Sequence, residues 1–193
     1  TIFVCKLINQ QSIVMKKSLT ILALLFIASS TFSQVFNTGQ TLKPKKFSLG
    51  LEPGVMMNGG SEFIMFIHGG YGIKQGIDFS AKVGVLGPLD YFGADVEFAL
   101  PHRMSFAVGA HQFGDFGLDG SLNITFPIKS DIRFSTGLDS DINFNDDKTR
   151  FLLWLPLGLE IGIKKNMSFI FEAEIGLTDP TYHFIGGGLN FYL

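Results

Sequence analysis

The sequence predicts an all-β fold, a closed antiparallel up-and-down transmembrane β-barrel of ten strands that follows an N-terminal signal helix. Hydrophobic residues make up 46% of the 193 residues and charged residues only 17%, yet no apolar run is long enough for a helical membrane span. From Lys46 onward, apolar and polar residues alternate with period two, and turn residues interrupt the alternation. Since the hydrophobicity is dispersed over short alternating segments, we expect strands to cross the bilayer, and strands in lipid must close into a barrel.

The N-terminal region has the three parts of a secretory signal peptide. Met15-Lys16-Lys17 is a short basic region, Leu19 to Ser29 is apolar, and Thr31-Phe32-Ser33 places small residues at the −3 and −1 positions. We therefore expect residues 15–33 to be a signal peptide that is cleaved after Ser33. A buried core helix is the alternative for the apolar run.

This cleavage divides the chain. Residues 1–14 are expected to be an over-extended N-terminus, 34–45 a polar periplasmic lead-in, and 46–193 the outer-membrane barrel. The single cysteine, Cys5, lies in the part that is removed, so neither a disulfide nor a lipoprotein anchor is expected. Residues 1–34 carry three lysines and no acid, so their removal changes the formal net charge from −2 to −5, which does not favour nucleic-acid binding.

The barrel region divides into ten segments, an even number, each near the length that a tilted strand needs to cross a bilayer. No helical periodicity competes with the alternation in this region. The segments are 46–56, 63–73, 77–86, 91–100, 104–113, 116–128, 132–144, 151–163, 167–177 and 182–193.

The alternation separates an apolar face from a face that holds nearly all the charges and many glycines. In a membrane barrel the charged face lines the lumen, whereas in a soluble barrel it would face water. The glycine content and the scarcity of lysine favour the membrane barrel. The residues expected to line the lumen are Asp78, Lys82, Asp95, Glu97, Asp119, Arg133, Asp139, Asp141, Glu160, Glu172 and Glu174, and Glu52 adds a tenth acid to this face.

Turns and aromatic residues predict how the barrel sits in the membrane. The turns after even-numbered segments are short and basic and are assigned to the periplasm, while the loops after odd-numbered segments are more acidic and are assigned to the exterior. Outward phenylalanines near the periplasmic rim are expected to form an aromatic girdle. They are Phe47, Phe79, Phe98, Phe106, Phe126, Phe134, Phe169 and Phe191.

Two segments depart from the simple pattern. Pro53 and Pro156 each remove a ladder hydrogen bond from a strand of a closed barrel, so a bulge is expected at both positions. In segment 63–73, the set Phe63, Met65, Ile67 and Tyr71 competes with Ile64, Phe66 and His68 for the outward face.

The chain ends inside a strand, in Tyr182–Leu193, whose outward residues are Leu189, Phe191 and Leu193. This ending resembles the terminal signal of outer-membrane proteins, except that an aromatic residue is usual where Leu193 stands. The leader ending in Ser33-Gln34 is similar to those of exported Bacteroidota proteins. The mature chain thus resembles small outer-membrane β-barrels of that Gram-negative phylum. The resemblance implies the barrel-assembly machinery and outer-membrane lipid as partners, and it transfers no functional residue.

No catalytic, metal or cofactor motif is visible, so no enzyme activity, metal site or cofactor is expected. The four histidines lack metal-ligand spacing, and no phosphate-binding loop or nucleophile elbow occurs. The best catalytic candidate is a pair of His111 and Asp115 near the external rim, for which a structural hydrogen bond is the favoured interpretation.

Three functions remain open at this point. The first is a structural or interaction barrel whose acidic interior is largely plugged by ion pairs of Lys82 and Arg133. The second is a narrow cation-preferring pore or minor transporter, because an acidic lining concentrates cations. The third is a soluble periplasmic barrel that binds an apolar ligand in an inward-facing apolar core.

Overall fold

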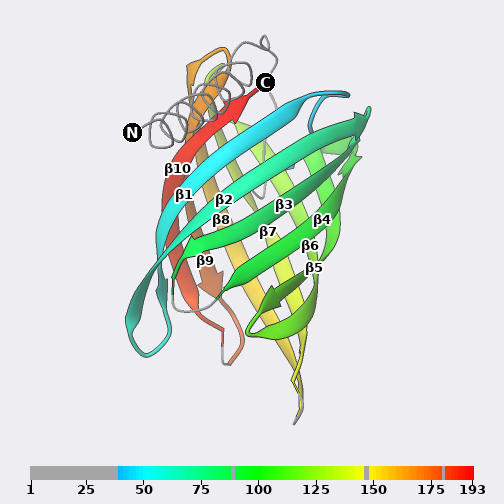
Figure 1. The fold of residues 1–193 in the computed structure, drawn as a ribbon. Coiled ribbons are helices and arrows are strands. Elements are labelled where there is room, and N and C mark those ends of the chain that lie inside the picture. Colours follow the sequence, from blue (N-terminus) through cyan, green and yellow to red (C-terminus); the bar gives the residue numbers. More distant parts are fainter. Residues whose placement is uncertain (1–38, 88–89, 146–147, 180) are drawn as a thin grey trace, which may run out of the picture.

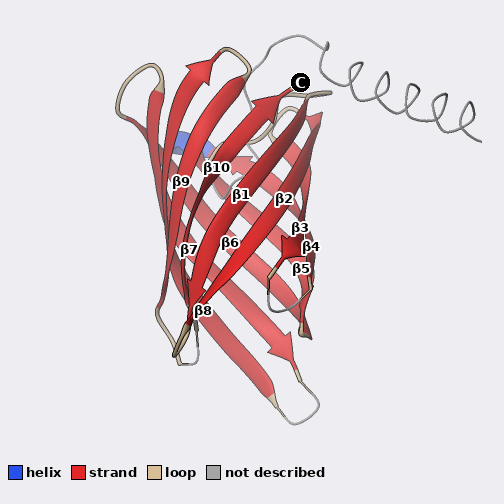
Figure 2. Cartoon of the chain, turned by 60° about the vertical axis from the view of Figure 1, so that its left-hand side comes forward, coloured by secondary structure: helices blue, strands red, loops and turns tan. Residues whose placement is uncertain are grey.

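A computed structural model describes residues 39–87, 90–145, 148–179 and 181–193. The predicted signal peptide and Cys5 lie outside these residues. Among the described residues, no helix is both long and apolar enough to span a membrane. The described chain forms a tall barrel with tilted strands (Figures 1 and 2).

Ten antiparallel strands close the barrel, as the sequence predicted. Each strand pairs with its neighbours in sequence, and β1 pairs with β10 to complete the circle. The predicted segment boundaries agree with the strand ends to within two residues. The strands are β1 Phe47–Met57, β2 Ser61–Lys74, β3 Ile77–Leu86, β4 Tyr91–Leu100, β5 Met104–Phe113, β6 Asp115–Pro127, β7 Ile132–Phe144, β8 Thr149–Lys164, β9 Met167–Gly176 and β10 His183–Tyr192, with a one-turn 3₁₀ helix at Pro101–Arg103.

The two ends of the barrel differ in their connections. The end at which β1 begins and β10 finishes is named here the terminus end, and it lies uppermost in Figure 1. The opposite end is named the loop end, and it carries the connections after odd-numbered strands. The strand bounds leave at most six positions for a connection there, 177–182 between β9 and β10, and only Gly114 between β5 and β6. The strands therefore do not extend into the long walls of an external cleft.

The exterior of the barrel is apolar and the interior is polar. On β8, the outward Phe151 is 56% exposed, while the inward Glu160 is 3% exposed. Charged and polar side chains such as Glu52 and Glu172 are buried inside the barrel, and Leu, Ile, Val and Phe side chains cover the outside. This distribution is the inverse of that of a soluble barrel and is typical of a barrel that spans a bilayer. The expectation of an apolar inward core, which the soluble alternative required, is wrong.

Aromatic side chains mark both rims of the apolar exterior. At the terminus end, Phe126 and Phe134 are register partners with ring centroids 6.4 Å apart. At the loop end, Phe116 and Phe144 on the same two strands are partners at 6.1 Å. The ten residue steps from Phe116 to Phe126 rise about 26 Å along the barrel axis at a strand tilt of about 40°. This height is close to that of the apolar band of known membrane barrels, about 25 Å.

The terminus-end pair belongs to the predicted girdle. Phe98 opposes Phe106 on β4 and β5, and Phe47 lies 4.6 Å from Tyr71 between ring centroids. Tyr71 therefore joins this ring of aromatics, although the sequence left its face open. The loop-end ring was not predicted, and its further exposed members are Phe63, Phe92 and Phe151.

The structure also settles the two irregular segments. On β2, Ile64, Phe66 and His68 are buried inside the barrel, while Phe63 faces outward. The bulges expected at Pro53 and Pro156 are wrong, because the register is the same on both sides of each proline. Instead, the ladder lacks pairs for two residues on one side of each proline, toward β10 and β7 respectively. A proline can thus be accommodated by omitting local pairs without inserting a residue.

Candidate functional site

The interior contains a cavity of about 410 Å³. Its wall extends from Asp78, near the terminus end of β3, to Asn58 and Asp115 at the loop end. The predicted lumen residues on this wall are Asp78, Lys82, Asp95, Glu97, Asp119, Asp139, Asp141, Glu172 and Glu174. The remaining two, Arg133 and Glu160, do not line the cavity and lie nearer the terminus end.

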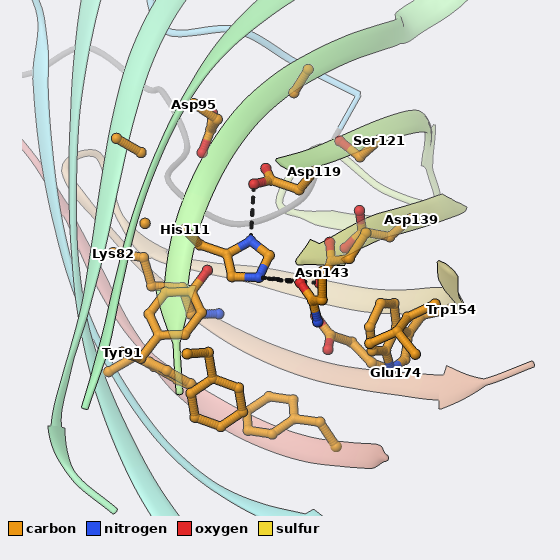
Figure 3. Close-up of a pocket in the computed structure, with 18 of the residues that line it drawn as sticks. Lys82, Tyr91, Asp95, His111, Asp119, Ser121, Asp139, Asn143, Trp154 and Glu174 are labelled. Atoms are coloured by element: carbon orange, nitrogen blue, oxygen red, sulfur yellow. Dashed lines mark hydrogen bonds and ion pairs between the residues drawn. The ribbon is translucent and has the colours of Figure 1, made fainter. Parts of the chain in front are cut away.

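His111 is the centre of a polar cluster on the β5, β6 and β7 side of the cavity (Figure 3). Its Nδ1 lies 3.1 Å from Asp119 Oδ1, and its Nε2 lies 3.1 Å from Asn143 Oδ1 and 3.6 Å from Asp141 Oδ2. The expected pair of His111 with Asp115 is wrong. Asp115 instead accepts two hydrogen bonds from Asn145 Nδ2, at 3.0 and 2.9 Å.

Local geometry explains this choice of partner. His111 is the register partner of Gly117, and Gly117 is also the partner of Asn143 on the next strand. A Cβ at Gly117 would lie 2.6 Å from the imidazole ring and 2.2 Å from Asn143 Oδ1. The missing side chain therefore provides the space in which the ring reaches the diagonal carboxylate and the amide of β7.

A second cluster surrounds Glu52, which is fully buried on β1. His68 Nε2 lies 2.6 Å from Glu52 Oε2, and Lys82 Nζ lies 3.4 Å from the same oxygen. Lys82 Nζ also lies 4.1 Å from the centroid of the Phe66 ring and 5.9 Å from that of Phe184. The ammonium group thus sits between a carboxylate and aromatic faces, and both attract a cation.

Aromatic residues line much of the rest of the cavity. Phe66 packs edge-on against Phe184 and Tyr91, and Tyr91 stacks on His111 with 5.9 Å between ring centroids. Trp154 donates a hydrogen bond from Nε1 to the carbonyl oxygen of Tyr182 at 2.9 Å. The sequence-based site did not include these aromatic residues. Trp154 carried a usable signal, because it shares the parity of Glu160 on the same strand and therefore its face.

The terminus end of the lumen is filled by a paired network. Arg133 Nη2 donates to Glu160 Oε1 at 2.8 Å, and the Tyr192 hydroxyl donates to the same oxygen at 2.8 Å. Ser168 Oγ lies 3.0 Å from the Tyr192 hydroxyl oxygen. Tyr192, Ser168 and Glu160 are almost completely buried. Here the acid and the base neutralise each other, and little space remains between them.

Residues 39–46 close the same end. Gly39 donates its N–H to Thr125 Oγ1 on β6 at 2.9 Å, and Gln40 Oε1 accepts from Arg133 on β7 at 3.2 Å. A few residues later, Leu42 donates its N–H to Asp78 on β3 at 2.5 Å. Lys45 and Lys46 then exchange backbone hydrogen bonds with Gly72 on β2.

In the closed strand order, β7 and β2 lie on opposite sides of the barrel. The segment 39–46, named here the plug segment, therefore crosses the mouth of the lumen. Leu42 lies in the middle of this crossing and is only 1% exposed. The sequence indicated a polar lead-in and gave no sign of this position, because the contacts join residues far apart in the chain.

The acids on the cavity wall exceed the bases. No ion pair among the described residues includes Asp95, Glu97, Asp139, Glu172 or Glu174. Within the same described ranges, no three acidic or imidazole groups converge closely enough to hold one metal ion. The arrangement therefore offers several separated acceptors for positive charge and no single coordination centre.

No protein-family model and no curated protein matches this chain in sequence. Among solved structures, the chain is similar to the KdgM porin, with a TM-score of 0.47, 9% identity, and coverage of 74% of this chain and 98% of that one. It is also similar to neisserial surface protein A, with a TM-score of 0.38, 12% identity, and coverage of 76% and 95%. The N-terminal β-barrel domain of Pseudomonas aeruginosa OprF gives a TM-score of 0.34, 16% identity, and coverage of 76% and 97%. These neighbours are outer-membrane β-barrels.

Proposed function

We propose that this protein is an integral outer-membrane barrel of the structural or interaction type, closed to through-passage at its periplasmic end. The plug segment is the observation that carries the proposal. It places Leu42 in the mouth of the lumen, and hydrogen bonds of Gln40 to β7 and of Lys45 and Lys46 to β2 attach it on opposite sides. The Arg133–Glu160–Tyr192 network fills the space beside it.

The orientation of the barrel follows from its connections. The terminus end carries short, basic turns, and the short loops at the other end are more acidic, so we assign the terminus end to the periplasm. Residues 15–33 would direct export as a cleaved signal peptide, and the barrel-assembly machinery would insert the strands into outer-membrane lipid. No catalytic group is assigned.

The test is a conductance measurement in planar bilayers on the purified mature protein. We expect no stable current steps, because the plug segment blocks the periplasmic mouth. A variant in which residues 39–45 are replaced by an equally long Gly-Ser segment loses the Leu42 contact and should show discrete steps. Stable steps in the unaltered protein would contradict the closed barrel.

A narrow cation-preferring pore is the second candidate, and the acidic wall of the cavity favours it. In this case the plug segment would leave the mouth during conduction. The unaltered protein would then conduct with cation selectivity, and the double variant D139N/D141N would reduce that selectivity, because it removes two acids from the wall.

A further inference from the structure

We propose that the cavity binds a small organic cation that carries more than one primary ammonium group, such as a linear polyamine. This inference goes beyond the closed barrel and does not depend on it, because a ligand can occupy the cavity whether or not the terminus end opens. Three observations support it, namely the volume of the cavity, the carboxylates on several parts of its wall, and the way in which the chain holds its own ammonium group.

The cavity has the size of a small-molecule site. Its volume of about 410 Å³ lies within the range of about 300–1,000 Å³ that such sites span. It reaches Asn58 and Asp115 beside the short loops of the loop end. A ligand from the exterior could therefore enter without crossing the plug segment.

Charged and aromatic side chains lie on both sides of the cavity (Figure 3). In that view, Lys82 and Tyr91 lie on one side, and Asp139, Trp154 and Glu174 lie on the other. Carboxylates come from three parts of the wall, which are β3–β4, β6–β7 and β9. Asn123, which is 2% exposed and lies on the same wall, has an Oδ1 atom with no hydrogen-bond partner among the described residues. Acceptors thus outnumber donors, and a complementary ligand must be a donor that carries positive charge.

Lys82 shows how the cavity accommodates an ammonium group. Its Nζ lies 3.4 Å from a Glu52 carboxylate oxygen and 4.1 Å from the centroid of the Phe66 ring. A ligand ammonium near Asp139 or Glu174 would meet the same combination, because Trp154 and Tyr182 lie on the same wall, with ring centroids 5.3 Å apart. The aromatic faces would also cover the methylene groups that join the ammonium groups.

The spacing of the acids favours a ligand with several ammonium groups over a single metal ion. No three acidic or imidazole groups of the described residues are close enough together to coordinate one ion. Separated carboxylates suit separated charges on a flexible chain, and each ammonium group supplies three N–H donors. A divalent metal ion would satisfy only one part of the wall at a time.

The experiment measures spermidine binding to the mature, folded barrel in detergent at about 150 mM salt, at which loose attraction between exposed charges is screened. Trp154 is the only tryptophan of the chain, and it lines the cavity, so its fluorescence reports occupancy. Titration calorimetry gives the affinity independently. We expect saturable binding with a change in Trp154 emission, and much weaker binding of Mg²⁺ tested alone.

The double variant D139N/E174Q removes two unpaired acids and should weaken spermidine binding by at least about tenfold, the loss expected for one charged hydrogen bond. Glu62→Gln is the matched control, because it removes a negative charge from an exposed position outside the cavity and should leave the affinity unchanged. Heat-modifiability on a gel verifies that each variant is folded. If the double variant does not fold, Asp139→Asn alone replaces it.

Three results would overturn the proposal. These are the absence of spermidine binding, binding of Mg²⁺ as strong as that of spermidine, and equal loss of affinity in the cavity and control variants. The last two would mean that only the overall charge of the barrel attracts cations. None of these results decides whether the barrel conducts, so the closed-barrel proposal stands or falls separately on the conductance measurement.

Discussion

The two halves of the lumen use the same types of residue to opposite effect. At the terminus end, one arginine, one glutamate and a tyrosine hydroxyl form a compact network beside the buried Leu42. From there to the loop end, many carboxylates surround a cavity of about 410 Å³, and several of them have no basic partner among the described residues. Acid and base are matched in the Arg133–Glu160 network, whereas acids are in excess around the cavity.

This difference separates stability from binding. A buried charge destabilises the fold unless a partner neutralises it. A network of paired charges can therefore close a lumen and leave no unpaired charge that would attract a ligand. Acids without basic partners can still bind a cation. The free-energy cost of placing their charges inside the barrel is offset by the stability of the rest of the fold. We therefore interpret the network at the terminus end as a structural closure. We interpret the cavity as a site at which an external cation can bind.

The largest expected effect comes from breaking the matched network. Arg133→Ala leaves Glu160 buried without its cation and should lower the free energy of unfolding by about 3–4 kcal/mol. Urea unfolding of the barrel in lipid vesicles measures this loss. Arg150→Ala at the loop end is the matched control, because Arg150 forms no ion pair among the described residues. Equal losses in the two variants would erase the distinction between the halves.

The plug segment should respond next. Leu42→Ala removes most of a side chain that is 1% exposed, and should weaken the seating of the segment by about 2–3 kcal/mol, the lower part of the range for buried leucines. Since the segment is attached by few hydrogen bonds, the loss should appear as faster protease cleavage within residues 39–46. Cleavage at the unaltered rate would show that Leu42 does not hold the segment.

A smaller effect is expected where the cavity depends on a missing side chain. Gly117→Ala places a Cβ 2.6 Å from the His111 ring, which must move, at a cost of about 1–2 kcal/mol. Gly120→Ala on the same strand is the control, because its Cβ would approach no other atom closer than 3.8 Å. The two variants are compared by urea unfolding, and an equal change in both would contradict the packing account of His111.

The smallest effect on stability is expected for an unpaired acid. Asp139→Asn replaces a half-buried carboxylate by its neutral isostere and should change the free energy of unfolding by less than about 1 kcal/mol, in the stabilising direction. Asp119→Asn removes a partner of His111 and should instead destabilise by about 1–3 kcal/mol. If both variants lose stability equally, Asp139 has a stabilising partner just as Asp119 does, and the cavity acids are not in excess.

Much of the barrel could be predicted because its signals are local. Alternation with period two assigns each residue of a strand to one face, so Asp139 and Leu138 could be placed on opposite sides without a structure. Turn residues then give the strand ends, which agree with the structure to within two residues. The predicted pairing of His111 with Asp115 was wrong because it relied on proximity in the sequence. Contacts between side chains on neighbouring strands depend on the strand register instead.

The sequence by itself determined the limits of the segments and the face of nearly every side chain, since these depend on periodicity and turn chemistry within a few residues, and it favoured ten strands over eight. Only the tertiary structure decided which inward side chains meet. Closure of the barrel brings Gln40 to Arg133, Leu42 to Asp78, and Glu52 to Lys82. Such contacts depend on the strand register and on the diameter of the closed sheet, and no local sequence pattern predicts either of them. The closed end and the acidic cavity are therefore properties of the assembled barrel.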